Sequence, residues 1–392
     1  MWARSYGTSV QTSPLTRDVH TGVVVVGAGI SGALMARELV RRGHDVTIVD
    51  RRAPVLGSTL ASTALLQFEI DLPLSALTDR IGRAKAERAW QRSTTAVQTL
   101  ARIVRKEHIR CAFSPRQSLY LAGDAYGSRA LQREVEARTR AGIAGTHLDR
   151  AALAREFGLD RTGAIVSDGS AAANPAQLTA GLLRRCVDAG AAIHSPVDIA
   201  QVRSHRRGVE LQSTDGAVIS AQHAVFCTGY ELLKELPLAG HRIKSTWAIA
   251  MRSRGALPRW LSHTLLWEAS NPYLYLRTIA DGQLIAGGED EDSGSRHLDG
   301  RALRSKAQRI ASNVEALLPG VRGTVTHRWA GAFGESPTGL PILDQVPGQS
   351  RCHVIAGFGG NGITYSVIGA EVIARRIDGQ RDPDADLFRA PR

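Results

Sequence analysis

The sequence predicts an α/β fold, and three observations support this prediction. A strand of four valines, Val23 to Val26, runs into a glycine loop, a helix and a second strand that ends at Asp50. A later apolar strand, residues 224–227, ends in Thr-Gly. Near the C-terminus a second glycine-rich loop, residues 357–362, leads into another amphipathic helix. Strands that alternate with helices through short loops are typical of a parallel sheet covered by helices.

The first glycine loop reads Gly27-Ala28-Gly29-Ile30-Ser31-Gly32. In this pattern the first glycine makes a tight turn, the second lets the backbone approach a pyrophosphate, and the third lets the helix pack close to the strand. The helix N-terminus offers N–H groups and a positive dipole to phosphates. Asp50, eighteen residues after the last glycine, is placed to accept hydrogen bonds from a ribose, next to Arg51 and Arg52. The unit predicts a bound dinucleotide, with a purely structural turn as the alternative, and it leaves NAD or FAD open.

Two later segments add cofactor contacts to this prediction. Four short hydroxyl side chains follow Gly57, in the stretch Gly57 to Thr63, and suit a loop that wraps a phosphate or a flavin edge. A capped helix start is the alternative, because Ser and Thr are good N-caps. The helix after Gly357–Thr364 would aim its N-terminus at a delocalised anion, which fits a reduced flavin charged at N1 and at the C2 carbonyl oxygen. A glycine-rich turn before a packing helix is the alternative there.

The complete prediction for the cofactor site draws on seven separate places in the chain. The residues are Gly27, Ala28, Gly29, Ile30, Ser31, Gly32, Asp50, Arg51, Arg52, Gly57, Ser58, Thr59, Ser62, Thr63, Ala64, Val197, Cys227, Thr228, Gly229, Gly331, Gly357, Gly359, Gly360, Asn361, Gly362, Ile363 and Thr364. No metal site is predicted.

Composition bounds the class of protein. The formal charge is +12, but the basic residues are mostly arginines scattered along the chain without interleaved stacking aromatics. This pattern does not favour nucleic-acid binding, and it is compatible with an anionic small substrate. The apolar runs are shorter than the roughly 18 residues of a membrane span, and residues 1–19 lack a secretory core and are expected to form a surface arm. The isolated Cys111, Cys186, Cys227 and Cys352 suggest buried thiols in a reducing compartment, so the cytoplasm is the expected location.

The rest of the chain is read from its periodicity. Helical patterns cover residues 81–109, 128–141, 149–157, 175–189 and 301–318, and strand-like alternation covers 116–124, 192–202, 209–211 and 218–220. Four further runs, at 247–251, 265–268, 273–278 and 284–287, predict successive strands of an antiparallel sheet. The acidic run Glu289–Asp292 is expected to be a solvated loop, with attraction of a polyamine as the alternative.

With these pieces in place, the chain resembles the FAD-dependent amine oxidoreductases of the D-amino acid oxidase type, which include glycine oxidase, sarcosine oxidase and gamma-glutamylputrescine oxidase. The motifs are VVVVGAGISG (23–32), TIVD (47–50), GSTLAST (57–63), AVFCTGY (224–230) and GFGGNGIT (357–364), in the order of the family. The resemblance implies a Rossmann-like FAD-binding domain (GR2-type) with an inserted antiparallel β-rich substrate domain. The FAD-binding domain would comprise residues 20–82, 160–238 and 334–385, and the substrate domain 83–159 and 239–333.

The chain departs from this family at the substrate site. Members that oxidise simple α-amino acids hold the substrate carboxylate with an arginine whose position matches Phe333 here, and sarcosine oxidases use a lysine whose position matches Thr364. Arg252 or Arg277 is a candidate replacement. Gly331 stands where some members carry the cysteine that attaches flavin, so the resemblance implies non-covalent FAD. The missing arginine and lysine argue against glycine, sarcosine or a plain D-amino acid as substrate.

The resemblance also implies a reaction. A hydride would pass from the carbon beside a neutral amine to flavin N5, the imine would be hydrolysed, and O₂ or another acceptor would reoxidise the flavin. The predicted catalytic residues are Lys244, as a promoter of the reaction with oxygen, together with Trp247, Tyr275, Arg277 and Phe333; Tyr273 is a further aromatic candidate. The expected partner is a small-molecule amine. The alternatives are an FAD enzyme acting on modified tRNA and a flavoprotein subunit of a hetero-oligomeric oxidase.

Overall fold

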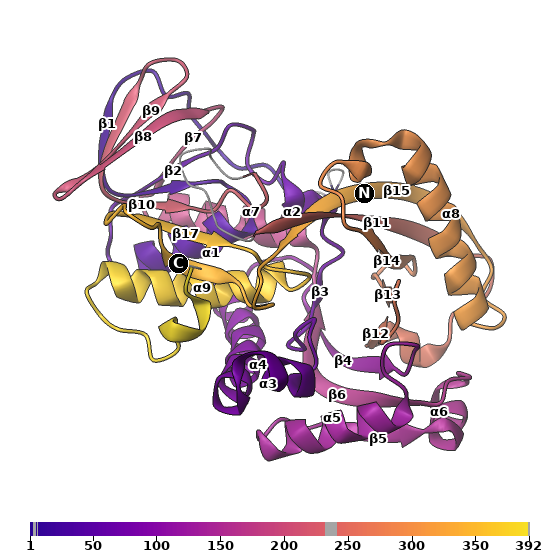
Figure 1. Cartoon of the computed structure of the whole chain (residues 1–392). Coiled ribbons are helices and arrows are strands. Elements are labelled where there is room, and N and C mark those ends of the chain that lie inside the picture. The colour runs from indigo at the N-terminus through magenta and orange to yellow at the C-terminus, as the bar shows by residue number, and fades with distance from the viewer. Residues whose placement is uncertain (3–4, 6, 232–240, 391–392) are drawn as a thin grey trace.

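The computed structural model describes residues 1–2, 5, 7–231 and 241–390. Two sheets form the framework, and Figure 1 shows them in separate lobes, with helices α3 to α6 running beneath both. The predicted α/β class is confirmed. In the described part of the chain, no helix is both long and apolar enough to cross a membrane.

The first sheet is parallel at its centre. Strands β1 (Val19–Val26), β2 (Val46–Val49), β7 (Ala192–His194), β10 (Val218–Phe226) and β17 (Cys352–Ala356) lie in the order β7-β2-β1-β10-β17. Counted along the chain this is the order 3-2-1-4-5 of a doubly wound sheet, whose direction of winding reverses between β1 and β10. Strand β16 (Ile342–Gln345) adds an antiparallel edge, and the hairpin β8 (Ile199–His205) and β9 (Gly208–Ser213) extends β10.

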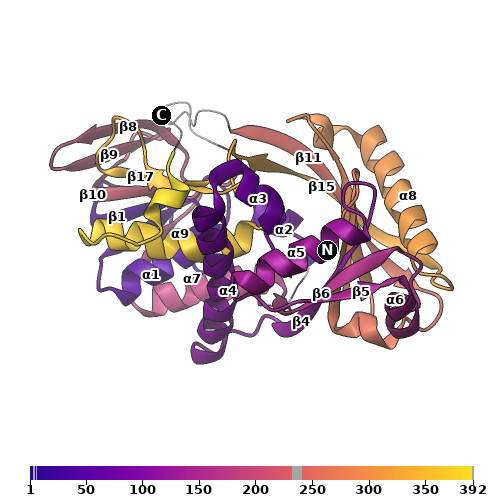
Figure 2. The same ribbon diagram turned by 60° about the horizontal axis from the view of Figure 1, so that its bottom comes forward.

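Three helices lie together in the lobe of the first sheet. Helices α1 (Ile30–Arg41), α7 (Pro175–Asp188) and α9 (Gly362–Ile377) are in contact, and the long helix α4 (Arg83–Lys106) packs against α9. Figure 2 shows α4 running between the two lobes. The helices bury apolar stripes such as Leu34, Leu39, Leu178 and Ile368 in one continuous core.

The second sheet is mixed. Its order is β15 (Gly323–Glu335), β11 (Arg242–Ser253), β14 (Leu284–Glu291), β13 (Leu274–Thr278), β12 (Thr264–Glu268), β4 (Ser114–Leu121), β6 (Gly163–Ala172) and β3 (Leu65–Leu66). Helix α8 (Gly300–Leu317) packs against β11, β14 and β15. The predicted antiparallel pairing holds within β11 to β14, but β12 runs parallel to β4, because a long connection rather than a hairpin joins those two strands.

The positions of the strands bear on the proposed domain limits. Strand β6 pairs with β3, β4 and β5 (Thr146–Asp149), so residues 163–172 lie in the second sheet and the chain returns to the first lobe at α7. The limit at residue 238 lies outside the described residues. The discontinuous two-domain division therefore stays a proposal.

The N-terminal arm is not wholly at the surface as predicted. Trp2 is 5% exposed and packs with Val55, Ala176 and Ile285. Its indole Nε1 donates to the carbonyl of Ser62 at 2.8 Å. Burial of the large apolar ring of Trp2 is favourable, and it holds the start of the arm against the protein although most residues of the arm are polar.

A buried charge pair joins helix α5 (Ser128–Arg140) to the start of α3 (Leu74–Ile81). Glu134 accepts hydrogen bonds from the backbone N–H groups of Leu74 and Ser75, at 2.8 and 2.9 Å, and from Arg138 Nε at 2.9 Å. The guanidinium of Arg138 lies 4.5 Å from the centre of the Trp90 ring. Burial would raise the pKa of Glu134, but Arg138 and the hydrogen bonds from Ser75 hold it below its usual value.

Replacing this acid tests its structural role. We expect Glu134→Ala to lower the free energy of unfolding by about 3–5 kcal/mol, because the buried Arg138 would lose its hydrogen-bonded carboxylate and keep only the more distant Glu69. Urea unfolding followed by circular dichroism measures the change. The matched control is Glu136→Ala, an exposed acid on the same helix, expected within about 0.5 kcal/mol of the unaltered protein. Equal stability of the two variants would contradict the prediction.

Candidate active site

A cavity of about 720 Å³ begins where the parallel strands end and extends to the second sheet. Its walls include Val26 at the end of β1, Cys227 just after β10, and Thr246, Tyr275 and Ala330 on strands β11, β13 and β15. The carboxyl ends of β1 and β10 mark the point where winding reverses, the usual ligand crevice of such sheets. The cavity therefore joins the nucleotide motif to the β-rich lobe.

The first glycine loop leaves no room for a side chain at Gly27 or Gly32. A Cβ atom on Gly32 would lie 1.7 Å from the carbonyl oxygen of Gly27. Gly27 has a φ of +111°, and its Cβ would lie 2.4 Å from the carbonyl oxygen of Cys227. Helix α1 begins after Gly29 without a side-chain cap from that residue, while Thr59 accepts a hydrogen bond from Ile30 N at 3.0 Å. The helix N-terminus thus points its backbone donors toward the cavity wall.

Asp50 is fixed by the backbone at the end of β2. Its Oδ2 accepts from Ala28 N at 2.7 Å and its Oδ1 from Arg52 N at 2.8 Å. Burial raises the pKa of Asp50, and these two N–H groups oppose the rise. Arg51 and Arg52 both pair with Glu231, a residue that sequence reasoning missed.

The hydroxyl-rich loop is held from outside by three distant side chains. It contains a short helix, α2 (Ser58–Ala61), whose N-cap is Gly57, so a helix starts here but without the Ser or Thr cap that the alternative expected. The four hydroxyl residues line the cavity, and their contact with a cofactor stays a prediction. Three consecutive carbonyls accept hydrogen bonds: Ala61 from Trp329 Nε1 at 2.9 Å, Ser62 from Trp2 Nε1 at 2.8 Å, and Thr63 from Arg277 Nε at 2.7 Å. The loop therefore has one fixed backbone shape.

The second glycine loop lies against an acidic segment. Gly360 N donates to Asp71 Oδ2 at 2.6 Å, and a Cβ on Gly359 would lie 2.3 Å from that oxygen. Asn361 Nδ2 donates to the carbonyl of Glu69 at 2.8 Å, and Thr364 Oγ1 to the carbonyl of Gln67 at 2.8 Å. Residues 67–71 and the start of α9 thus form one wall.

Sequence reasoning missed the residues of this acidic segment. Gln67, Glu69 and Asp71 line the cavity, while Phe68 and Ile70 are buried in the core of the first lobe. The polar-apolar alternation from Gln67 to Asp71 was the signal that could have found them, because alternate residues of an extended chain face opposite sides.

Most predicted cofactor residues line the cavity. They are Gly27, Gly29, Ile30, Ser31, Asp50, Arg51, Arg52, Gly57, Ser58, Thr59, Ser62, Thr63, Ala64, Val197, Cys227, Thr228, Gly229, Gly331, Gly359, Gly360, Asn361, Gly362, Ile363 and Thr364. Three others, Ala28, Gly32 and Gly357, do not line it and instead belong to the backbone turns that shape it. Contact with a cofactor stays a prediction for each of them.

The predicted catalytic residues divide into two groups. Tyr275 and Phe333 line the cavity, as does Tyr273. Lys244, Trp247 and Arg277 are not among the residues that line it. Lys244 pairs with Glu335 at 2.9 Å and Asp292 at 3.2 Å. Burial alone would lower the pKa of Lys244, but these ion pairs raise it.

Trp247 and Arg277 have structural surroundings. Trp247 lies in the core of the second lobe, 4.9 Å from Lys306 Nζ. Arg277 is 3% exposed and donates to the carbonyls of Thr63 and Ala173, at 2.7 and 2.8 Å. Burial lowers the pKa of Arg277 to about 9. Both hydrogen bonds place the guanidinium among backbone carbonyls rather than at a substrate carboxylate. The other candidate anchor, Arg252, is exposed and does not line the cavity.

The expectation of a solvated acidic loop was wrong. Glu289 to Glu291 form the end of strand β14. Glu289 is 2% exposed and pairs with Lys306 at 3.3 Å and Arg309 at 2.9 Å. Strand pairing overrides the charge pattern because cations on α8 compensate the buried carboxylate.

Comparisons with known proteins agree on one family. The family model described as "FAD dependent oxidoreductase" matches residues 22–376. The "Probable oxidoreductase OrdL" of Haemophilus influenzae is 20% identical over 94% of this chain and 85% of its own length. The "tRNA 5-methylaminomethyl-2-thiouridine biosynthesis bifunctional protein MnmC" of Thiobacillus denitrificans is 24% identical over 94% of this chain, which spans 58% of that protein. The structure of glycine oxidase from Geobacillus kaustophilus matches with a TM-score of 0.80 at 21% identity, covering 95% of this chain and 99% of that one.

The residues of the cavity fit FAD. The crowded glycine crossing brings backbone rather than side chains to the place of a pyrophosphate. The N-terminus of α9 begins after Asn361 without a side-chain cap, and the shielded Oδ1 of Asn361 has no hydrogen-bond partner among the described residues. Such an end offers positive dipole to an anionic ring. Gly331 lines the cavity and carries no group that could bond to a flavin.

The first test of this site changes the glycine crossing. We expect Gly32→Ala to reduce bound flavin, since its Cβ would force the α1 N-terminus away from Gly27 at a cost of about 1–3 kcal/mol. Visible flavin absorbance per chain measures occupancy. Gly255→Ala, where a Cβ would meet nothing within 4 Å, is the control and should keep the full complement. Unchanged flavin occupancy in Gly32→Ala would contradict a role of this glycine loop in binding the cofactor.

A second test concerns Arg277. We expect Arg277→Met to lower the melting temperature and the flavin occupancy, because each abandoned carbonyl, on Thr63 and on Ala173, costs about 1–3 kcal/mol. The flavin-loaded fraction should keep its KM for substrate. Arg252→Met, which removes the same charge at an exposed position, is the control and should change neither the melting temperature nor the flavin occupancy. A large rise in KM with unchanged stability would instead make Arg277 a substrate anchor.

Proposed function

The chain belongs to the family of FAD dependent oxidoreductases, and on that premise we propose that it oxidises a C–N bond in a small amine or amino-acid derivative. The observation that carries the proposal is a continuous cavity that joins the first glycine loop and Asp50 to an aromatic wall on the second sheet. The glycine oxidase that shares its fold supports the reaction class, since that protein by name oxidises an amino acid.

The chain's own residues supply binding and orientation. FAD, when bound, supplies the acceptor for the two electrons of the oxidation. The hydroxyls of Thr63 and Thr246 lie close enough to the Tyr275 phenol to oppose the rise in its pKa that burial causes, so the aromatic wall adjoins the loop that would hold the cofactor. Phe333, 9% exposed, adds an apolar surface that excludes water beside the reacting carbon.

An anaerobic experiment tests the proposal. The purified flavoprotein is mixed with amines, N-alkyl amino acids and diamines, and loss of the oxidised flavin absorbance is followed. Reduction by at least one amine is expected, and admission of air with detection of hydrogen peroxide then distinguishes an oxidase from a dye-linked dehydrogenase. If no amine reduces the flavin, the proposal fails for the isolated chain. Reduction only after a second subunit is added would favour a hetero-oligomeric oxidase.

A second candidate is an FAD enzyme acting on modified tRNA. Its support is the match to bifunctional proteins whose name describes tRNA 5-methylaminomethyl-2-thiouridine biosynthesis. The chain spans 58% of the one and 57% of the other, so their whole activity does not transfer to it. Salt-dependent binding of tRNA, measured by filter retention, would favour this candidate, and absent or salt-independent retention would remove it.

Lys244 provides a further prediction about the reaction with oxygen. Its ammonium is neutralised by Glu335 and Asp292 outside the cavity lining. We therefore expect Lys244→Met to change the rate of flavin reoxidation by less than about 5-fold, the equivalent of about 1 kcal/mol for a partly exposed ion pair. Stopped-flow mixing of the reduced protein with oxygenated buffer measures this rate. A much larger loss would return Lys244 to the role the sequence suggested.

A further inference from the structure

The inner part of the cavity has the composition of a cation site. We propose that the wall formed by residues 67–71, Asn361 and strands β12–β13 binds a cationic nitrogen of the substrate, so that the substrate is an amine with a second cationic group and no carboxylate beside the reacting carbon. The inference rests on the proposed function and names the substrate class for that same site.

The distribution of charge around the cavity separates two ends. Among the described residues that line it, the arginines are Arg51 and Arg52, there is no lysine, and both arginines are paired with Glu231 beside the nucleotide clamp. The inner wall includes Glu69 and Asp71. The Glu69 side chain has no exposed surface and accepts hydrogen bonds from Ser118 and Ser170, so Asp71 is the carboxylate that is open to the cavity. A substrate carboxylate placed there would meet the like charge of Asp71, and Lys244, which acts on Asp71 from outside the lining, is itself paired with Glu335 and Asp292.

Asp71 is the carboxylate most available to a ligand. It is exposed to the cavity, and Gly360 N donates to its Oδ2 at 2.6 Å. Desolvation by the surrounding protein, opposed by that N–H and aided by the charges of Glu335 and Asp290, raises the pKa of Asp71 to about 6, and Lys244 acts in the opposite direction. An acid in such surroundings gains from an added positive charge.

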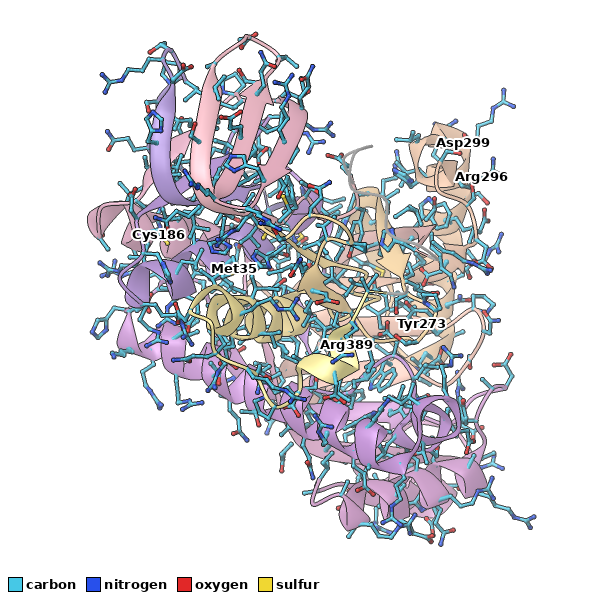
Figure 3. The ribbon with its side chains drawn as sticks, turned by 60° about the vertical axis from the view of Figure 1, so that its left-hand side comes forward. Met35, Cys186, Tyr273, Arg296, Asp299 and Arg389 are labelled. Carbon is cyan, nitrogen blue, oxygen red and sulfur yellow. The ribbon has the colours of Figure 1, made fainter. Side chains whose placement is uncertain are left out.

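More acid stands behind the aromatic wall. Burial raises the pKa of Asp290, and the nearby hydroxyls of Thr246 and Tyr273, both of which line the cavity, oppose the rise. Asp290 Oδ1 has no hydrogen-bond partner among the described residues. Tyr273 belongs to the lobe of the second sheet, as Figure 3 shows, whereas Met35 and Cys186 lie on helices of the first lobe. The two tyrosine rings, Tyr273 and Tyr275, lie 5.8 Å apart by centroid.

An independent observation points to a donor ligand. Asn361 is 6% exposed and lines the cavity, and its Nδ2 is used by the carbonyl of Glu69. Its Oδ1 has almost no accessible surface and accepts no hydrogen bond among the described residues. A buried acceptor of this kind calls for an N–H donor. An ammonium group supplies such donors and is attracted to carboxylates and to aromatic faces alike.

The remaining polar atoms of the wall are neutral. Gln67 Nε2 and Trp267 Nε1 are shielded donors without partners among the described residues. Trp267 stacks on Tyr120 with ring centroids 3.8 Å apart, which fixes the position of the donor. These groups suit an uncharged acceptor atom of the substrate or cofactor, and they add no positive charge. Arg138 lies behind Glu69, with Nη1 4.0 Å from Oε1, and is fully buried.

Matched substrates test the charge preference in the flavin-loaded protein. The probes are 1,4-diaminobutane, its mono-N-acetyl derivative, and N-methylglycine, each assayed by anaerobic flavin reduction for kcat and KM. The second cation should lower KM for the diamine relative to the acetylated amine by about 10- to 100-fold, the range of a hydrogen bond to a charged group. N-methylglycine should be the poorest of the three.

Variants assign the effect to this wall. Asp71→Asn is expected to remove most of the preference for the diamine, measured as the ratio of the KM values of the acetylated amine and the diamine, and Asp290→Asn should lower that ratio more weakly. Asp168→Asn, an exposed acid on β6, is the control and should keep the preference. Binding of unreactive tetramethylammonium, measured by perturbation of the flavin spectrum, gives a readout besides turnover.

The pH dependence gives a third readout, and its sign follows from the charges. A cation binds the ionised carboxylate, so diamine affinity should fall as pH drops through about 6, the raised pKa of Asp71. The diamine itself stays protonated there, since aliphatic ammonium groups titrate near pH 10. Asp71→Asn should lack this loss. If Asp71→Asn does not retain flavin, the ranking of the three substrates by KM and the pH profile of the unaltered protein decide whether the cation site exists.

The possible outcomes distinguish a failure of the cation site from a failure of the proposed C–N oxidation. A preference for N-methylglycine, or a diamine preference untouched by Asp71→Asn and by pH, overturns the cation site while C–N oxidation stands. Failure of every probe and of every amine in the wider panel to reduce the flavin overturns the proposed function itself.

Discussion

The whole site depends on one crowded crossing of the backbone. The end of β1, the start of α1 and the end of β10 meet where Gly27 and Gly32 have no room for a Cβ, against the carbonyls of Gly27 and Cys227. Because the backbones approach so closely, the N-terminus of α1 and the ends of both strands face one crevice. The order of the parallel strands places that crevice at the point where winding reverses, so topology and local sterics fix the same location.

The crevice becomes an active-site cavity because the two lobes hold a shared loop. The carbonyls of residues 61–63 accept hydrogen bonds from β15, from the N-terminal segment and from β13. Trp329, Trp2 and Arg277 thus set the shape of a loop that belongs by sequence to the nucleotide half. Such donors relieve buried carbonyls and fix one backbone conformation, which is how a β-rich lobe can orient a cofactor bound mainly by its neighbour.

Motifs with a local mechanism could be predicted from the sequence, whereas the direction of side chains on the second sheet could not. The glycine loops, the hydroxyl loop and Asp50 all line the cavity or shape it, since their roles depend on neighbours in sequence. Lys244 and Trp247 were chosen for residue type, but strand β11 changes register against β14 between Ser245 and Trp247. A bulge of this kind alters which face each side chain occupies and leaves no trace in a single sequence. Arg277 and Trp2 likewise bind partners far away along the chain.

The local field of the cavity runs against the charge of the whole protein. The formal charge of +12 describes the whole protein, and taken alone it is compatible with an anionic substrate. Screening over about 8–10 Å confines surface arginines to their own surroundings, and many of them are already paired, as Arg51 and Arg52 are with Glu231. The described residues that line the inner end of the cavity include Asp71 and no arginine or lysine. A fixed charge at the site outweighs many distant cations, so under the proposed cation site this wall, and not the composition, sets the charge of the substrate.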